Sequence, residues 1–258
     1  MTLKPQHTWM KSKYAWIRQW LAFGVVLAVW EAAGRAGMLN PLFAPSPSQI
    51  IKALVELFTT GSIWPHLEAT FGAALGGLAL GIVVGVVLGV IAALVPFIAE
   101  LLQPVMTLLN AIPRVVLAPL FAIWFGIGIA SKVALAFILV AVLIFFTVYT
   151  GILHVDKRLV ERITTLGGGR WALIRYVYLP SVASWILSNM KVAVGFAFTG
   201  AVVGEFVAAS RGLGYLLSFA QSTYNSALML ALVMLIMAVV LIIFAVSGRI
   251  EKRLMRWN

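Results

Sequence analysis

The chain alternates between long apolar stretches and short polar connections. Six of the apolar stretches are close to the length of about 20 residues that a helix needs to cross a bilayer. They cover approximately residues 17–33, 67–95, 101–125, 133–153, 182–208 and 227–247. The pattern predicts an all-α integral membrane protein with six transmembrane helices between residues 17 and 247.

The polar connection at residues 34–65 contains the signal for one short additional helix. Ser46 precedes Pro47, and Gln49 stands three residues after Ser46, which is the pattern of a capping box with proline in the first turn. Apolar residues then recur at helical spacing, opposite charged ones. We expect an amphipathic helix that lies on the membrane surface or on the helix bundle.

Four glycines in the second stretch share one face of a helix. Gly77, Gly81, Gly85 and Gly89 are each four residues apart, and small residues at this spacing allow two membrane helices to approach closely. The pattern predicts close helix packing. A sliding surface used during gating is a second interpretation that the sequence does not separate from the first.

The third stretch is the most polar and the most interrupted. Pro104, Pro113 and Pro119 lie within it, and Asn110 and Arg114 flank the central proline. Each proline removes one helical hydrogen bond, and broken helices at membrane depth occur where protein or a watery cavity covers them. We therefore predict that Asn110 and Arg114 line a translocation path. The alternative is that Arg114 binds carbonyl groups freed by the neighbouring prolines.

Two charged residues of the fifth stretch are further candidates for the path. Lys191 lies inside the stretch and Glu205 lies close to its end. Ionisable residues within membrane spans are costly and mark functional sites by default. The alternative for Lys191 is that its side chain reaches back to the membrane surface.

A long polar break runs from Glu161 to Pro180, within a loop at residues 154–181. Three successive glycines, starting at Gly167, separate two short helical segments, and glycine suits a turn that needs positive φ. Pro180 stands where a new helix can begin. We predict a basic, amphipathic helix–turn–helix at the membrane surface.

The basic residues orient the chain in the membrane. Thirteen lie on the side of the two termini and the polar break, and four lie on the other side, so the first side is predicted to be cytoplasmic. Residues 1–16 and the basic tail at 248–258 are then cytoplasmic. A basic start before a short apolar run is also typical of a signal peptide, but cleavage would remove a span that the even count requires.

Composition excludes several other classes of protein. The chain is 62% hydrophobic and 10% charged, against about 25% charged residues in soluble domains. The net charge of +11 follows membrane topology and gives no reason to expect nucleic-acid binding. With no cysteine and three scattered histidines, no metal site or catalytic residue is predicted. Residues 126–132, GIGIASK, lack the second glycine and the final Ser or Thr of a phosphate-binding loop, so no nucleotide site is expected.

The polar break also resembles a known motif. Glu161, Gly167, Val177, Leu179 and Pro180 have the spacing of the EAA loop of bacterial ABC importer permeases, although other residues replace the two alanines. Three further segments are similar to the group that serves nitrate, taurine, alkanesulfonates, bicarbonate and pyrimidine precursors. They are PSPSQIIKALVELF (45–58), APLFAIWFGIG (118–128) and RGLGYLL (211–217).

The resemblance implies a type I ABC permease arrangement in the bacterial inner membrane, with a cytoplasmic coupling helix pair. It implies that a separate ATPase subunit, in two copies, binds ATP and Mg²⁺ and docks on this pair. The residues that it assigns to coupling are Glu161, Leu166, Gly167, Arg170, Leu179 and Pro180. The other implied partners are a second permease subunit and an extracytoplasmic binding protein. A homodimer is the simplest assembly, and a different second permease is the alternative.

Two other functional classes remain for comparison. A secondary transporter driven by an ion gradient needs acidic residues at mid-depth, whereas the acidic residues here fall near the ends of the stretches. A membrane-embedded enzyme needs a constellation of catalytic side chains, which the sequence does not contain. The resemblance implies instead an importer permease for a small organic or inorganic anion or a pyrimidine-type precursor.

Overall fold

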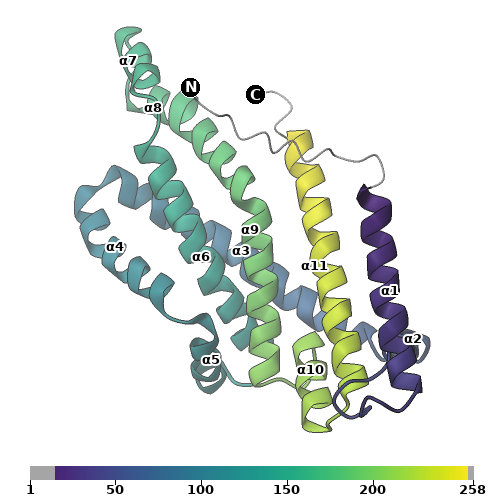
Figure 1. Ribbon diagram of the computed structural model, residues 1–258. Helices are drawn as coiled ribbons and strands as arrows, with labels where there is room; N and C mark the ends of the chain where they lie inside the picture. Colours follow the sequence, from purple (N-terminus) through teal and green to yellow (C-terminus); the bar gives the residue numbers. More distant parts are fainter. Residues whose placement is uncertain (1–14, 255–258) are drawn as a thin grey trace, which may run out of the picture.

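The computed structural model describes residues 15–254, and this part of the chain consists of helices and turns (Figure 1). In chain order the elements are α1 (Ala15–Arg35), α2 (Pro47–Thr59), α3 (Trp64–Leu94), α4 (Pro96–Ala111), the 3₁₀ turn η1 (Arg114–Val116), α5 (Leu117–Phe125), α6 (Ile129–Leu153), α7 (Lys157–Thr165), α8 (Arg170–Leu173), the π-helical turn η2 (Ile174–Tyr178), α9 (Leu179–Val207), α10 (Leu213–Ser222) and α11 (Ser226–Leu254). The predicted all-α class is confirmed.

Four helices within the described residues are long and apolar enough to cross a membrane. They are Trp64–Leu94, Ile129–Leu153, Trp171–Val207 and Ser226–Arg249. They correspond to the second, fourth, fifth and sixth predicted stretches. Helix α1 contains 21 residues but carries Arg18, Glu31 and Arg35, and it is not among the four.

The third stretch is not one helix, so the prediction of a single span at 101–125 needs correction. Helix α4 ends at Ala111, and α5 begins six residues later, after η1. Ile112 between them is extended, with φ −68° and ψ 129°. A residue before proline is driven out of the helical region by the proline ring, so Pro113 separates the two helices.

The core of the bundle is the contact of α3 with α6, which the predicted glycine face makes possible. A Cβ atom added at Gly81 would lie 2.6 Å from Cβ of Val140, and one at Gly85 would lie 2.8 Å from the carbonyl oxygen of Ala141. Gly77 and Gly89 face α6 in the same way. No side chain fits between the two backbones, so the prediction of close helix packing is confirmed.

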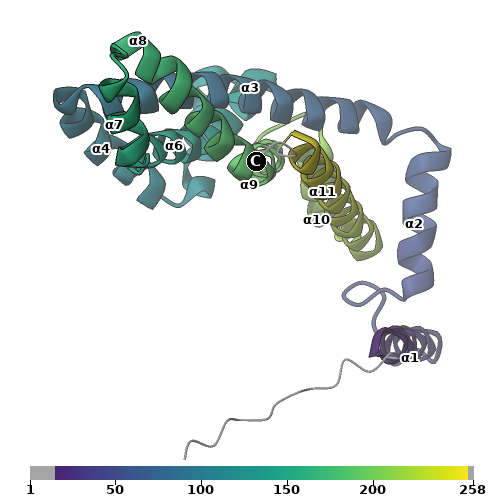
Figure 2. The same ribbon diagram turned by 90° about the horizontal axis from the view of Figure 1, so that it is seen from above.

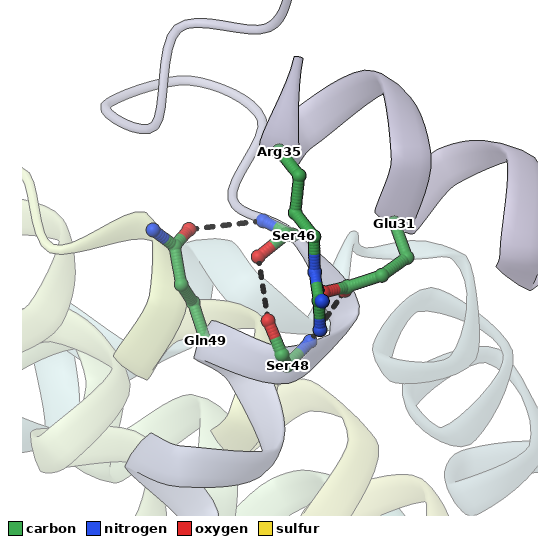
Figure 3. Close-up of polar contacts among 5 residues, drawn as sticks. All are labelled: Glu31, Arg35, Ser46, Ser48 and Gln49. Carbon is green, nitrogen blue, oxygen red and sulfur yellow. Dashed lines mark hydrogen bonds and ion pairs between the residues drawn. The ribbon is translucent and has the colours of Figure 1, made fainter. Parts of the chain in front are cut away.

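Helix α2 begins at Pro47, as the capping box predicts. The carboxamide oxygen Oε1 of Gln49 accepts a hydrogen bond of 3.0 Å from the N–H group of Ser46 (Figure 3). This bond satisfies one backbone donor just before the helix. The helix packs against α11, so it lies on the bundle.

Helix α1 is joined to the rest of the chain through α2. Oε2 of Glu31 accepts a bond of 3.0 Å from the N–H group of Ser48 in the first turn of α2, and Oε1 of Glu31 pairs with Nε of Arg35 at 2.7 Å (Figure 3). A carboxylate at the start of a helix is favourable because the free N–H groups of the first turn point toward it. Figure 2 shows α1 standing apart from α6 and α9, at the far end of α2.

We predict that Gly81→Ala lowers the stability of the protein, because the new methyl group cannot fit between α3 and α6. Overpacking of this kind costs about 1–3 kcal/mol. The measurement is the thermal midpoint of the detergent-solubilised protein. Gly72→Ala is the matched control in the same helix, because its Cβ would lie at an ordinary 3.6 Å from Cδ1 of Ile129. Equal midpoints for the two variants would contradict the role of the glycine face.

Candidate functional site

The predicted helix–turn–helix is present at residues 154–181. Helix α7 is capped by Asp156, whose carboxylate accepts a bond of 2.9 Å from the N–H group of Arg158. The helix ends in a Schellman motif, in which Gly168 N–H bonds to the Ile163 carbonyl at 2.9 Å and Gly167 N–H bonds to the next carbonyl. Gly167 has φ +79°, which explains why glycine stands at this turn.

The second half of this segment differs from the prediction, because no new helix begins at Pro180. A single helix runs from Trp171 to Val207 through the π-helical turn η2. The N–H group of Leu179 bonds to the carbonyl of Ile174, five residues back. Proline lacks an N–H group and its ring crowds the carbonyl four residues earlier. A π turn changes the hydrogen-bond register next to the proline, so the helix continues.

Helices α7 and α8 project beyond the ends of α6 and α9 (Figure 1). This segment exposes large apolar side chains. Leu166 is 80% exposed and Trp171 is 83% exposed. Trp171 was not predicted as a site residue, although a tryptophan in a polar loop is a signal that sequence reasoning can use. Exposed aromatic residues are enriched where proteins bind one another. Arg170 begins α8, and Leu179 and Pro180 are exposed.

Glu161 of α7 is exposed. With Lys157 and Tyr178 it lines a pocket of about 380 Å³. The ends of α3 and α6 contribute the apolar walls, which include Leu94 and Ile152. The pocket lies where the polar segment meets the spanning helices.

The four predicted path residues do not form one site. Asn110 is in the last turn of α4, beside Leu139 of α6. Arg114 is the first residue of η1, directly after the break between α4 and α5, and its side chain lies outside the described part. The ammonium group of Lys191 lies 5.2 Å from the centre of the Phe244 ring of α11. The structure brings Asn110 and Arg114 to the same break and does not place Lys191 with them.

Glu205 lies apart from the other three, in a buried polar network at the far end of α9. Its side chain is 2% exposed. Its Oε2 atom accepts bonds from the Thr70 hydroxyl at 2.8 Å and from the Gly214 N–H group at 3.0 Å. Lys132, predicted to lie in an outer connection, is buried beside it and lines the same cavity of about 150 Å³.

The comparisons with known proteins identify the family. Residues 81–256 match the family described as "Binding-protein-dependent transport system inner membrane component". The chain belongs to this family. It is therefore the permease subunit of an ABC importer, a transport component and not an enzyme, as the sequence predicted.

Curated relatives of the permease cover nearly all of it. The riboflavin transport system permease protein RibX of Chloroflexus aurantiacus is 34% identical over 93% of this chain and 92% of its own length. The putative aliphatic sulfonates transport permease protein SsuC of Escherichia coli is 30% identical, with 98% of this chain and 95% of that protein covered. The taurine transport system permease protein TauC of the same organism is 26% identical over 91% of this chain and 87% of that protein.

Solved structures share the fold of the permease. An inward-facing structure of the MetNI methionine ABC transporter superposes with a TM-score of 0.59 at 20% identity, covering 74% of this chain and 93% of that one. An amino acid ABC transporter crystallised with histidines superposes with a TM-score of 0.61 at 18% identity. The match covers 80% of this chain and 98% of that one. The family excludes the alternatives of a secondary transporter driven by an ion gradient and of a membrane-embedded enzyme.

Proposed function

We propose that residues 154–181 are the segment through which the ATPase subunit drives this permease. The observation that carries the proposal is the direct continuation of this segment into the membrane. Residues Trp171–Val207, which take in α8 after its first residue, η2 and α9, form one helix of 37 residues, which is about 55 Å long at 1.5 Å per residue. A force applied at α8 therefore acts on a rod that spans the bundle.

The residues of the segment have complementary roles in this proposal. Leu166 and the additional residue Trp171 supply an apolar contact for the ATPase, and Glu161 and Arg170 supply charges around it. Gly167 holds the angle between α7 and α8 through its positive φ. Leu179 and Pro180 hold the π turn that joins the segment to α9.

The Gly167→Asp variant tests the coupling role. We expect it to insert normally but to bind the ATPase at least about tenfold more weakly, because an aspartate at φ +79° strains the turn and changes its angle. The measurement is the amount of ATPase that copurifies with the tagged permease. Gly169→Asp adds the same charge two residues away, where φ is not positive and a Cβ meets nothing within 4 Å. Copurification that is equal in the two variants and the wild type would refute the proposal.

We also propose that the chain crosses the membrane six times, with both termini in the cytoplasm. Figure 1 supports this topology, because α1 begins and α11 ends toward the end of the molecule that carries α7 and α8. Helices α4 and α5 together run from that end to the opposite one. They would form a crossing in two pieces, and α1 would be the first span.

Reporter fusions test this topology. A green fluorescent protein joined after Gly168 should fluoresce, because that position is predicted to be cytoplasmic. Alkaline phosphatase joined after Thr223, beyond α10, should be active, since this enzyme needs an extracytoplasmic location. Phosphatase activity from a fusion after Gly168 would show that the orientation is reversed.

The family is binding-protein-dependent, which implies an ATPase and an extracytoplasmic binding protein as partners. We propose an assembly of two permease copies with two ATPase subunits, in which the ATPases hold the ATP and Mg²⁺. The substrate proposed for it is a small solute like those named for its relatives. These are riboflavin, taurine, aliphatic sulfonates and formylaminopyrimidine. Two of the four names denote compounds that carry a negatively charged sulfonate group.

We propose that Asn110 and Arg114 contact the solute as it passes the break between α4 and α5. Pro113 has no N–H group, and the helical bonding of α4 ends at Ile112. Irregular backbone at membrane depth is tolerated where it lines a cavity. A guanidinium group at such a place favours a sulfonate or carboxylate because it donates several hydrogen bonds in one plane.

The Arg114→Gln variant tests this path. We expect taurine uptake to fall at least about tenfold, because the loss of one charge-assisted contact is typically worth about 1.5–3 kcal/mol. ATPase copurification should remain. Lys191→Gln is the matched control, since the Lys191 ammonium group lies over the Phe244 ring. Riboflavin uptake, measured in parallel, separates the two solute classes. If the system imports taurine and the Arg114 variant imports it at the wild-type rate, Arg114 does not line the path.

A further inference from the structure

A cluster of buried polar residues joins four parts of the permease at the end opposite α7 and α8. We call it the polar clamp and define it by His66, Thr70, Lys132 and Glu205. The first two belong to α3, Lys132 belongs to α6 and Glu205 belongs to α9. The family motif and the proposed coupling segment do not include any of the four.

The first half of the clamp holds the start of α10. Three successive N–H groups at this helix end are bound by side chains of other helices. Nδ1 of His66 accepts from Gly212 at 3.0 Å, the Thr70 hydroxyl oxygen accepts from Leu213 at 2.9 Å, and Oε2 of Glu205 accepts from Gly214 at 3.0 Å. The first N–H groups of a helix have no partner inside it, and a carboxylate there also interacts favourably with the helix dipole.

The loop packs tightly against Glu205 at two glycines. A Cβ atom at Gly212 would collide with the Glu205 carboxyl group, and one at Gly214 would collide with the carbonyl oxygen of Val202. Gly212 also has φ +120°, a backbone conformation that is strained for residues other than glycine. The two glycines of the RGLG sequence are therefore explained by the close approach of this loop to the Glu205 side chain and to the backbone of α9.

The second half of the clamp holds the end of α9 to the start of α6. The ammonium group of Lys132, which is 3% exposed, donates to the carbonyl oxygen of Ile127 at 2.7 Å and to the Ser131 hydroxyl at 3.1 Å. It also donates to the carbonyl of Ala208, the last residue of the α9 cap. One cation thus bridges the α5–α6 connection and the α9–α10 connection.

We propose that Glu205 and Lys132 are positioning residues for transport, because they make the far ends of α3, α6, α9 and α10 move as one block. The inference rests on the proposed coupling function of residues 154–181. A rod driven at one end turns its neighbours only if it is fastened to them elsewhere. Hydrogen bonds to buried charged groups hold neighbouring helices firmly together. Breaking such a bond leaves a polar group without a partner in a medium of low dielectric constant, which is costly.

Because the two residues carry opposite charges, single and double variants can test the proposal. Glu205→Gln and Lys132→Met keep the size of the side chains but leave the other charge without its counterpart. The double variant removes both charges. Glu205 and Lys132 line the same cavity, and the effects of neighbouring residues are not additive, so the double variant should lose less than the product of the two single losses.

The whole sequence contains no cysteine, so spin labels attached to two introduced cysteines can measure a distance directly. Spin labels at Glu68→Cys on α3 and Gln221→Cys on α10 report the distance across the clamp, and both positions are exposed. In the complex with its ATPase, we expect the same narrow distance distribution without nucleotide and with ATP and vanadate. Glu205→Gln and Lys132→Met should broaden the distribution, and each should reduce taurine or riboflavin uptake about tenfold while the ATPase still copurifies.

Controls separate this proposal from the coupling proposal and from loss of folding. Gly128→Ala at the same end meets nothing within 4 Å and should leave the distribution unchanged. Thr70→Val removes the bridging hydroxyl with little change in volume, and it serves as the test variant if Glu205→Gln does not fold. A wild-type distance that changes with nucleotide, or unaltered width and uptake in both charge variants, would overturn the clamp. If the wild-type permease fails to bind the ATPase, the coupling proposal fails. The width of the distance distribution, compared between the wild type and the charge variants without nucleotide, still tests the clamp.

Discussion

The close approach of α3 to α6 is the contact on which the rest of the bundle depends. The hydrophobic effect does not drive two helices together in lipid, because the lipid is itself apolar. Their association therefore depends on close packing. The glycine face supplies this contact over four turns, and it brings Val140, Ile144 and Val148 of α6 against the backbone of α3. These three side chains are completely buried. Helix α9 then packs on the same pair through small residues such as Gly200, whose neighbour is the backbone of Ala136.

A second constraint is that each backbone group inside a membrane needs a partner within the protein. The chain meets this constraint differently at its irregular points. At Pro180 a π turn shifts the bonding register and keeps the helix continuous. At Pro113 the helix stops, and η1 and α5 resume the bonding after an extended residue. At Gly212 the free donors of α10 are bound by side chains from α3 and α9.

These solutions explain which features the sequence alone predicts. The capping box at Ser46, the turn at Gly167 and the glycine face of α3 are set by residues close together in the chain, and all three were predicted correctly. The continuation of the helix through Pro180 was missed, because Pro180 at the start of a helix and Pro180 after a π turn look alike in sequence. The burial of Lys132 was missed for another reason: its partners Ile127 and Ala208 are brought together only by the packing of α6 on α9.

The orientation of the long helix Trp171–Val207 is set at both of its ends. A π turn is equivalent to one inserted residue, which rotates the part before it by about 100° around the helix axis. Val177 in this turn is buried, whereas Trp171 and Tyr176 face outward. The π turn thus sets the direction in which the proposed coupling segment presents its apolar surface. At the other end, Glu205 is held to Thr70 of α3 and to the start of α10. A rod whose rotation is defined at both ends transmits a turning motion, whereas a rod held at one end would dissipate it in the loops.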